Sequence, residues 1–89
     1  NVPDEKAIGL LTKTMKNGDE SKDVRIAAAD ALRMYPRPEV GQALVAVLQD
    51  RNFAVSWQAR KSLQLMTGKD FKFDQAAWLN YLASEGKLG

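Results

Sequence analysis

Histidine and cysteine, the residue types that most often act as general bases, nucleophiles and zinc ligands, do not occur in this chain of 89 residues. Carboxylates, lysines, serines and tyrosines remain, but they form no recognisable nucleophile arrangement. A chain of this length also commits most of its apolar residues to its own core, which leaves little for a deep pocket. We therefore expect no enzymatic activity and no cofactor.

One acidic segment could be read as a cation site, because Asp19, Glu20 and Asp23 lie close together. The segment lacks the alternating oxygen ligands and the central glycine of a calcium loop. Ser21 or Asp23 is better suited to cap a helix N-terminus. The sequence therefore predicts no metal site.

The balance of charge bears on nucleic acid as a partner. The formal net charge is +2, from 13 basic and 11 acidic residues spread along the chain, which is low for non-specific phosphate binding. Arg33, Arg37, Arg60 and Lys61 could still form a basic stripe, although Asp30 interrupts it. Nucleic-acid binding through this stripe is therefore the second hypothesis for function.

Apolar residues at helical spacing predict a first helical hairpin over residues 4–35. Asp4 is the expected N-cap of its first helix, whose apolar face is Ile8, Leu11 and Met15 and which ends near Lys16. The second helix has to end before Pro36. Its expected buried face consists of Val24, Ala28, Ala31, Leu32 and Tyr35.

A second hairpin is predicted over residues 37–67. Pro38 suits the first turn of a helix that ends near Asp50, and Gly68 suits the C-terminus of the helix that follows. The expected core residues of the two helices are Val40, Ala43, Leu44, Val47, Leu48, Val55, Ala59, Ser62, Leu63 and Met66.

The remaining segment, residues 68–85, is expected to be a capping loop and helix. Phe71 and Phe73 in the loop should plug the end of the core, and Asp74 can cap a helix that buries Ala77, Trp78, Tyr81 and Leu82. A period-two strand pattern is absent, so we expect an all-α fold with residues 1–89 as a single domain.

The two hairpins are related in sequence. A shift of 31 positions aligns Asp19 with Asp50, Val24 with Val55, Ala28 with Ala59 and Leu32 with Leu63. Repeats of this length stack so that neighbouring units complete one core. The small residues Ala28, Ala31, Ala59 and Ser62 would let the helices approach closely.

Residues 23–32, Asp-Val-Arg-Ile-Ala-Ala-Ala-Asp-Ala-Leu, resemble the second helix of HEAT repeats, especially the short phycobilisome-lyase-like subgroup. Leu48-Gln49-Asp50 is similar to the inter-helix turn of that family, and the tail with Trp78 is similar to the cap of bacterial HEAT arrays. The resemblance implies a right-handed α-α superhelix, a HEAT-like solenoid, in which Arg25 pairs with an Asp of the repeat turn. Ser56 stands where the family has its Arg, so this ladder is not expected to continue there.

The resemblance also implies a non-enzymatic scaffold or interaction module that binds through its second helices. A helical projection places Ile26, Arg33, Trp57, Arg60 and Gln64 on the outward face, and we expect this face to contact a protein or peptide. Trp57 either lies exposed there or is covered by an added helix or the N-terminal segment. Because two repeats are few, self-association or membership of a longer array is also expected.

The sequence constrains the compartment only weakly. No apolar run approaches the ~18 residues of a membrane span, and the first residues do not resemble a leader. The chain is either a mature form or a piece of a longer protein, and it could be cytoplasmic or exported.

Overall fold

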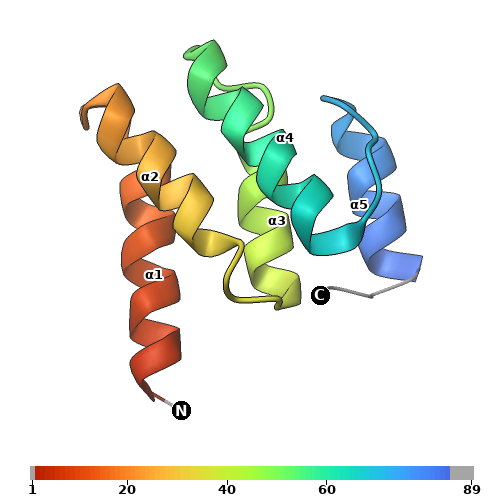
Figure 1. The fold of residues 1–89 in the computed structure, drawn as a ribbon, viewed down its shortest axis with the longest axis horizontal. Coiled ribbons are helices and arrows are strands. Elements are labelled where there is room, and N and C mark those ends of the chain that lie inside the picture. Colours follow the sequence, from red (N-terminus) through yellow and green to blue (C-terminus); the bar gives the residue numbers. More distant parts are fainter. Residues whose placement is uncertain (1, 85–89) are drawn as a thin grey trace.

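The computed structural model describes residues 2–84, and Figure 1 shows the five α-helices that it contains. They are α1 (Val2–Lys16), α2 (Lys22–Leu32), α3 (Pro38–Ala46), α4 (Phe53–Thr67) and α5 (Gln75–Ser84). Turns and loops make up the rest of this range. The all-α prediction is confirmed for the described residues, and residue 85 of the expected cap lies outside them.

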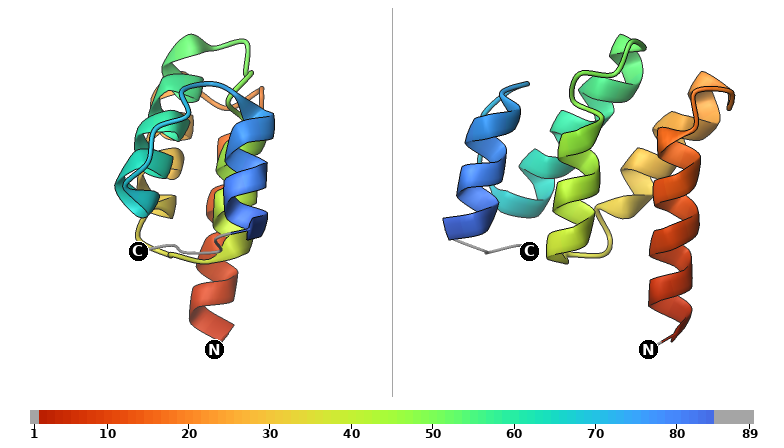
Figure 2. Two further views of the ribbon diagram at one scale, coloured as in Figure 1. Left: turned by 90° about the vertical axis from the view of Figure 1, so that its right-hand side faces the viewer. Right: turned by 180° about the vertical axis from the view of Figure 1, so that it is seen from behind.

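The helices form two layers, as the left view of Figure 2 shows. One layer contains the first helix of each hairpin, α1 and α3, followed by α5; the other contains α2 and α4. Contacts join α1 to α2, α3 to α4, α2 to α4 and α3 to α5. The two hairpins therefore stack side by side, and α5 continues the layer of the first helices.

The predicted N-cap is wrong for α1 and is confirmed for α2. α1 begins at Val2, so Asp4 lies in its first turn, where a carboxylate suits the helix dipole, and not at the N-cap. In contrast, Ser21 is the N-cap of α2, since its Oγ accepts a hydrogen bond from the Val24 N–H at 3.3 Å. Of the two cap candidates, Ser21 holds the position and Asp23 lies in the first turn.

The predicted ends of α2 and α3 are a few residues too late. α2 ends at Leu32, and the backbone then continues in tighter i to i+3 turns as far as Tyr35. α3 ends at Ala46 and is followed by similar turns through Asp50. Such tight turns commonly close helices, and the apolar spacing continues through them. The sequence pattern therefore overestimates the helix lengths.

Local caps fix both ends of α4 and the start of α5. The Asn52 Oδ1 accepts a hydrogen bond from the Ala54 N–H at 3.0 Å, and Gly68 ends α4 with a left-handed φ of 76°. Glycine adopts this conformation without a steric penalty. Asp74 Oδ1 accepts from the Ala77 N–H at 3.0 Å, which confirms the predicted cap of α5.

Both hairpins and α5 contribute to a single core. Its fully buried large side chains are Trp78, Met15, Leu32, Leu44, Leu63, Val40 and Val55. The predicted buried face of α2 was wrong at one edge, because Val24 is 43% exposed whereas Arg25 and Ala29 are buried. α2 is therefore rotated relative to the prediction, and Ala29, which was not among the expected core residues, packs against the core.

The two second helices meet through small residues, as expected from the sequence. Ala28, Ala59 and Ser62 are all buried. The Ser62 hydroxyl donates a hydrogen bond to the Ala29 carbonyl of α2 at 2.8 Å and accepts one from the Gln58 side chain at 3.2 Å. Ser62 therefore adds a directional link between the hairpins to the close approach that its size allows.

Candidate protein-binding surface

The five residues predicted to contact a partner belong to one layer of helices. Ile26 lies on α2, Arg33 is the C-cap residue directly after it, and Trp57, Arg60 and Gln64 lie on α4. Trp57 is 43% exposed, so no part of the described chain covers it completely. The other four are half-buried, and Ile26 packs partly against the core. Trp57 is thus the most accessible member of the predicted set.

Trp57 belongs to a row of apolar side chains along α4 that the sequence analysis did not identify. Phe53 lies one turn before it and is 64% exposed, and Leu65 lies two turns after it and is 59% exposed. Lys61 comes between Trp57 and Leu65, and its Nζ lies 5.4 Å from the centroid of the Trp57 ring. We call Phe53, Trp57 and Leu65 the α4 ridge. The i, i+4, i+12 spacing was the signal that could have identified it.

Arg60 is held from one side by the loop between α4 and α5. Its Nε donates to Asp70 Oδ1 at 3.0 Å and its Nη2 to Oδ2 at 2.7 Å, and its guanidinium lies 5.3 Å from the Phe73 ring centroid. Phe73 in turn lies 5.6 Å from Phe53. Arg60 and the loop therefore support one edge of the α4 ridge.

This pair shifts the pKa of both partners. The hydrogen bond from Arg60, followed by that from the Lys72 N–H, lowers the pKa of Asp70 from 3.8 to about 2. The same bond raises the pKa of Arg60. Both side chains remain charged over the physiological range, so the link between α4 and the loop is an ion pair throughout.

Most of the basic side chains in the predicted stripe form ion pairs with carboxylates of the chain. Arg33 Nε lies 2.9 Å from Asp30 Oδ1, Arg37 Nη2 lies 3.2 Å from Asp4 Oδ2, and Arg60 pairs with Asp70. These carboxylates offset the positive charge that a phosphate backbone would need. The geometry therefore does not favour nucleic acid as the partner.

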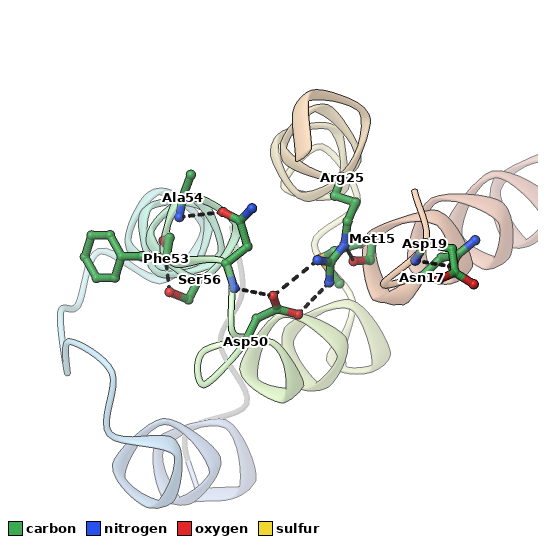
Figure 3. Close-up of polar contacts among 9 residues, drawn as sticks. Met15, Asn17, Asp19, Arg25, Asp50, Phe53, Ala54 and Ser56 are labelled. Carbon is green, nitrogen blue, oxygen red and sulfur yellow. Dashed lines mark hydrogen bonds and ion pairs between the residues drawn. The ribbon is translucent and has the colours of Figure 1, made fainter. Parts of the chain in front are cut away.

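Arg25 has the structural role that the resemblance implied. Figure 3 shows its guanidinium between the end of α1 and the turn before α4. Its Nε donates to the Met15 carbonyl at 2.8 Å, its Nη1 donates to Asp50 Oδ1 at 3.2 Å, and its Nη2 donates to Asp50 Oδ2. The side chain is 7% exposed and that of Asp50 is 18% exposed. Arg25 thus joins the first repeat to the second and is not free to bind a ligand.

In the second repeat, the turn before α4 is held by hydrogen bonds of its own residues, which are drawn on the left of Figure 3. Asp50 Oδ1 also accepts from the Asn52 N–H at 2.9 Å. The hydrogen bond from Arg25 lowers the pKa of Asp50, against the opposing effect of burial. Ser56 stands at the repeat position of Arg25 and donates to the Phe53 carbonyl of its own helix at 3.0 Å. The Arg–Asp link therefore runs from Arg25 to Asp50, and Ser56 makes a local bond instead.

Two shallow hollows lie away from the α4 ridge. One, of about 330 Å³, is at the end of the molecule near Arg25 and Asp50, with Lys16, Lys22 and Arg51 around it. The other, of about 420 Å³, lies between α1 and α3 and is lined by Ile8, Gly9, Thr12, Lys13, Lys16, Glu39, Gln42 and Ala43. Within residues 2–84, no group of three potential metal ligands gathers at either place or elsewhere.

In the same part of the chain, the structure has no helix with the length and apolarity needed to cross a membrane.

Comparison with known protein families matches residues 1–77 to the family described as HEAT repeats. Neither the search of curated proteins nor the search of solved structures returned a match. Repeats of this family generally mediate protein–protein interaction or scaffolding and are typically non-enzymatic. The match spans both hairpins and the start of α5, in agreement with the stacked geometry. The chain therefore belongs to the HEAT-repeat family.

Proposed function

We propose that this chain is a non-enzymatic interaction module that binds a protein or peptide with the outward face of its second helices. The exposure of Trp57 between Phe53 and Leu65 carries this proposal. Three large apolar side chains in one row lose contact with water when a partner covers them, which favours binding. Trp is also among the residue types that most often dominate binding energy at interfaces.

The surroundings of the α4 ridge suit a partner with apolar anchors and polar flanks. Arg33, Arg60 and Gln64 border the ridge, and Lys61 stands over Trp57. Asp30 and Asp70 pair with the two arginines, so a partner at this border meets charges that are already partly offset. We propose an amphipathic helix, whose apolar stripe can follow the ridge, as the bound element.

The Trp57→Ala variant tests this proposal. Phage-displayed helical peptides selected on the wild-type chain should bind the variant with a loss of about 2 kcal/mol or more, since truncation removes the central anchor. The circular dichroism spectrum and melting temperature should stay nearly unchanged, because the ring is partly exposed. Leu79→Ala on α5 is the matched control, because Leu79 is 45% exposed and lies on a different helix. Equal losses of affinity in the two variants, or no loss in Trp57→Ala, would contradict the proposal.

A further inference from the structure

One charged side chain, Lys61, interrupts the apolar row of the α4 ridge. Trp57, Lys61 and Leu65 follow one another at intervals of four residues, so they lie on successive turns along one side of the helix. Lys61 is exposed, and its Nζ lies 5.4 Å from the centroid of the Trp57 ring. The ammonium group therefore stands among the apolar side chains of the ridge and not at its border.

Among the described residues, no carboxylate forms an ion pair with Lys61. The two carboxylates nearest to the outward face of α4 each pair with an arginine. Asp30 lies 2.9 Å from Arg33 Nε, and Asp70 lies 2.7 Å from Arg60 Nη2. In the free chain the ammonium group is therefore solvated by water, as is usual for a lysine whose stem lies along an apolar surface.

A partner that covers the α4 ridge also takes water away from this ammonium group. Trp57 and Leu65 lie on either side of Lys61, so an element that packs on both of them encloses the charge between them. Burial of an ammonium group without a counter-charge is costly. A carboxylate on the partner offsets this cost and accepts a charge-assisted hydrogen bond. The arrangement therefore disfavours a partner whose contact stripe is apolar throughout.

The spacing along α4 indicates where this carboxylate stands in a helical partner. Trp57 and Leu65 are eight residues apart, which corresponds to about 12 Å along a helix axis. A partner helix that lies along the ridge covers the same length with about eight residues of its own. An aspartate or glutamate in the middle of this stretch, about four residues from a large apolar side chain on either side, then meets Lys61.

We propose that the partner of the α4 ridge is an amphipathic helix with an aspartate or glutamate in the middle of its apolar stripe, where the carboxylate pairs with Lys61. The proposal rests on the proposed function, because it states which kind of helix the same surface binds. Trp57 supplies the apolar anchor, and Lys61 determines the specificity. A helix with a lysine or arginine at this position is rejected, because like charges then meet in a dry contact.

A membrane surface is the other anionic partner that an exposed apolar row can meet. Amphipathic helices that bind membranes typically carry several lysines or arginines along their polar face. Here Arg33 and Arg60, which border the ridge, pair with carboxylates of the chain. Within residues 2–84, Lys61 is the one cation of this row without a carboxylate. These observations favour a single carboxylate over a layer of lipid phosphates.

Parallel selections from a phage-displayed library of helical peptides test the proposal. Peptides selected on the wild-type chain should carry an aspartate or glutamate about four residues from a large apolar residue, and those selected on Lys61→Glu should carry a lysine or arginine there. The strongest wild-type peptide should bind Lys61→Glu at least about tenfold more weakly, and Lys61→Gln with an intermediate loss. Replacement of its acidic residue by lysine should restore binding to Lys61→Glu.

Lys13→Glu on α1 is the matched control. It makes the same change of charge at an exposed lysine in the other layer of helices, so it should bind the wild-type peptide as the wild-type chain does. The circular dichroism spectra of both variants should equal that of the wild type, because both side chains are exposed. Equal losses in Lys13→Glu and Lys61→Glu would overturn the inference, since they would reflect net charge alone.

Trp57→Ala separates this inference from the proposed function. Peptides that require Trp57 but bind Lys61→Glu as tightly as the wild type would overturn the inference and leave the proposed function intact. If no peptide is selected, or if binding does not require Trp57, both fail. Vesicles of phosphatidylcholine and phosphatidylserine in equal parts should leave the fluorescence of the exposed Trp57 unchanged. A blue shift that Lys61→Glu removes would assign the ridge to lipid and overturn the inference.

Discussion

Arg25 shows how one buried charge can set the register of two repeats. It starts on α2, reaches the carbonyl of Met15 at the end of α1, and pairs with Asp50 of the next repeat. A guanidinium at 7% exposure is costly unless its donors are satisfied, and these two partners accept from three of its nitrogens. The pair therefore favours the one stacking geometry that keeps all three bonds.

Asp50→Asn should lower the free energy of unfolding by about 2–3 kcal/mol. The variant leaves the buried Arg25 cation without a counter-charge, although the amide oxygen can still accept one hydrogen bond. Urea denaturation followed by circular dichroism measures the change. Asp19→Asn is the matched control, because Asp19 has the same repeat position in the first hairpin and is exposed, and it should change stability by less than about 0.5 kcal/mol. Equal losses in the two variants would contradict the role assigned to Arg25.

Two glycines lie in the first helices of the hairpins, and only one of them, Gly41, contacts α5. A Cβ added at Gly41 of α3 would lie 3.0 Å from Cδ1 and 3.3 Å from Cδ2 of Leu82 on α5. A Cβ added at Gly9 of α1 would meet nothing within 4 Å. A side chain at Gly41 would therefore press on the end of Leu82, which would have to shift slightly. At Gly9 there is room for a side chain, and glycine there only makes the helix less stable.

Gly9→Ala should raise the free energy of unfolding by about 0.5–1 kcal/mol, the usual gain for alanine inside a helix. Gly41→Ala should gain less, because Leu82 has to move to admit the methyl group. Thermal unfolding of the two single variants, and of Gly41→Ala combined with Leu82→Ala, measures the coupling. The gain at Gly41 should return in the Leu82→Ala background. An equal gain at both glycines in the wild-type background would show that Leu82 does not pack over Gly41.

The sequence predicted which helices exist better than which sides they bury. The spacing of Ile8, Leu11 and Met15 identified α1, and the Gly68 signal located the end of α4. The orientation of α2 was partly wrong, because alanines at four of five consecutive positions from residue 27 make nearly every side of the helix apolar. The spacing of apolar residues cannot show which face of such a helix is buried. The buried Arg25 lay on the side that the pattern assigned to polar residues.

The candidate site was predictable only in part, for a related reason. A helical projection places Trp57 on the outward face from the sequence alone. It does not show whether another segment covers that face, since this depends on the path of the loop through residues 69–74. That loop reaches Arg60 and Phe53 through Asp70 and Phe73, and it leaves Trp57 accessible. The contacts are between distant residues that local patterns do not relate.

At the scale of the whole molecule, the two ends of the array are closed differently. The C-terminal end has two closures: α5 packs on α3 with Trp78 fully buried, and the loop covers one side of α4. The Trp78 indole N–H also donates to the Lys72 carbonyl at 2.8 Å, which ties the loop to α5. At the other end of the described chain, Figure 1 shows α1 and α2 with no helix beyond them. The described closure of the array is therefore at its C-terminal end.

The pair of Arg60 and Asp70 predicts how the C-terminal closure responds to acid. The pKa of Asp70 is about 2 in the folded chain, below its ordinary value of 3.8. A carboxyl group whose pKa is lowered by folding contributes its full stabilisation above the unfolded value and loses it as the pH falls through the folded value. The contribution should therefore be nearly complete above about pH 5 and should decline as the pH falls from there to about 2.

Melting temperatures of the wild type and of Asp70→Asn, measured from about pH 6 to about pH 2, test this prediction. The wild type should be the more stable chain at pH 6, and the difference should shrink to a small fraction of that value by about pH 2. Arg60→Gln should reproduce the behaviour of Asp70→Asn, since either change removes the same ion pair. A difference in melting temperature that stays constant across this range would mean that Asp70 acts by something other than its charge. In that case the ion pair would not be what holds the loop on α4, and the contacts of Phe73 with Arg60 and Phe53 would remain as the link.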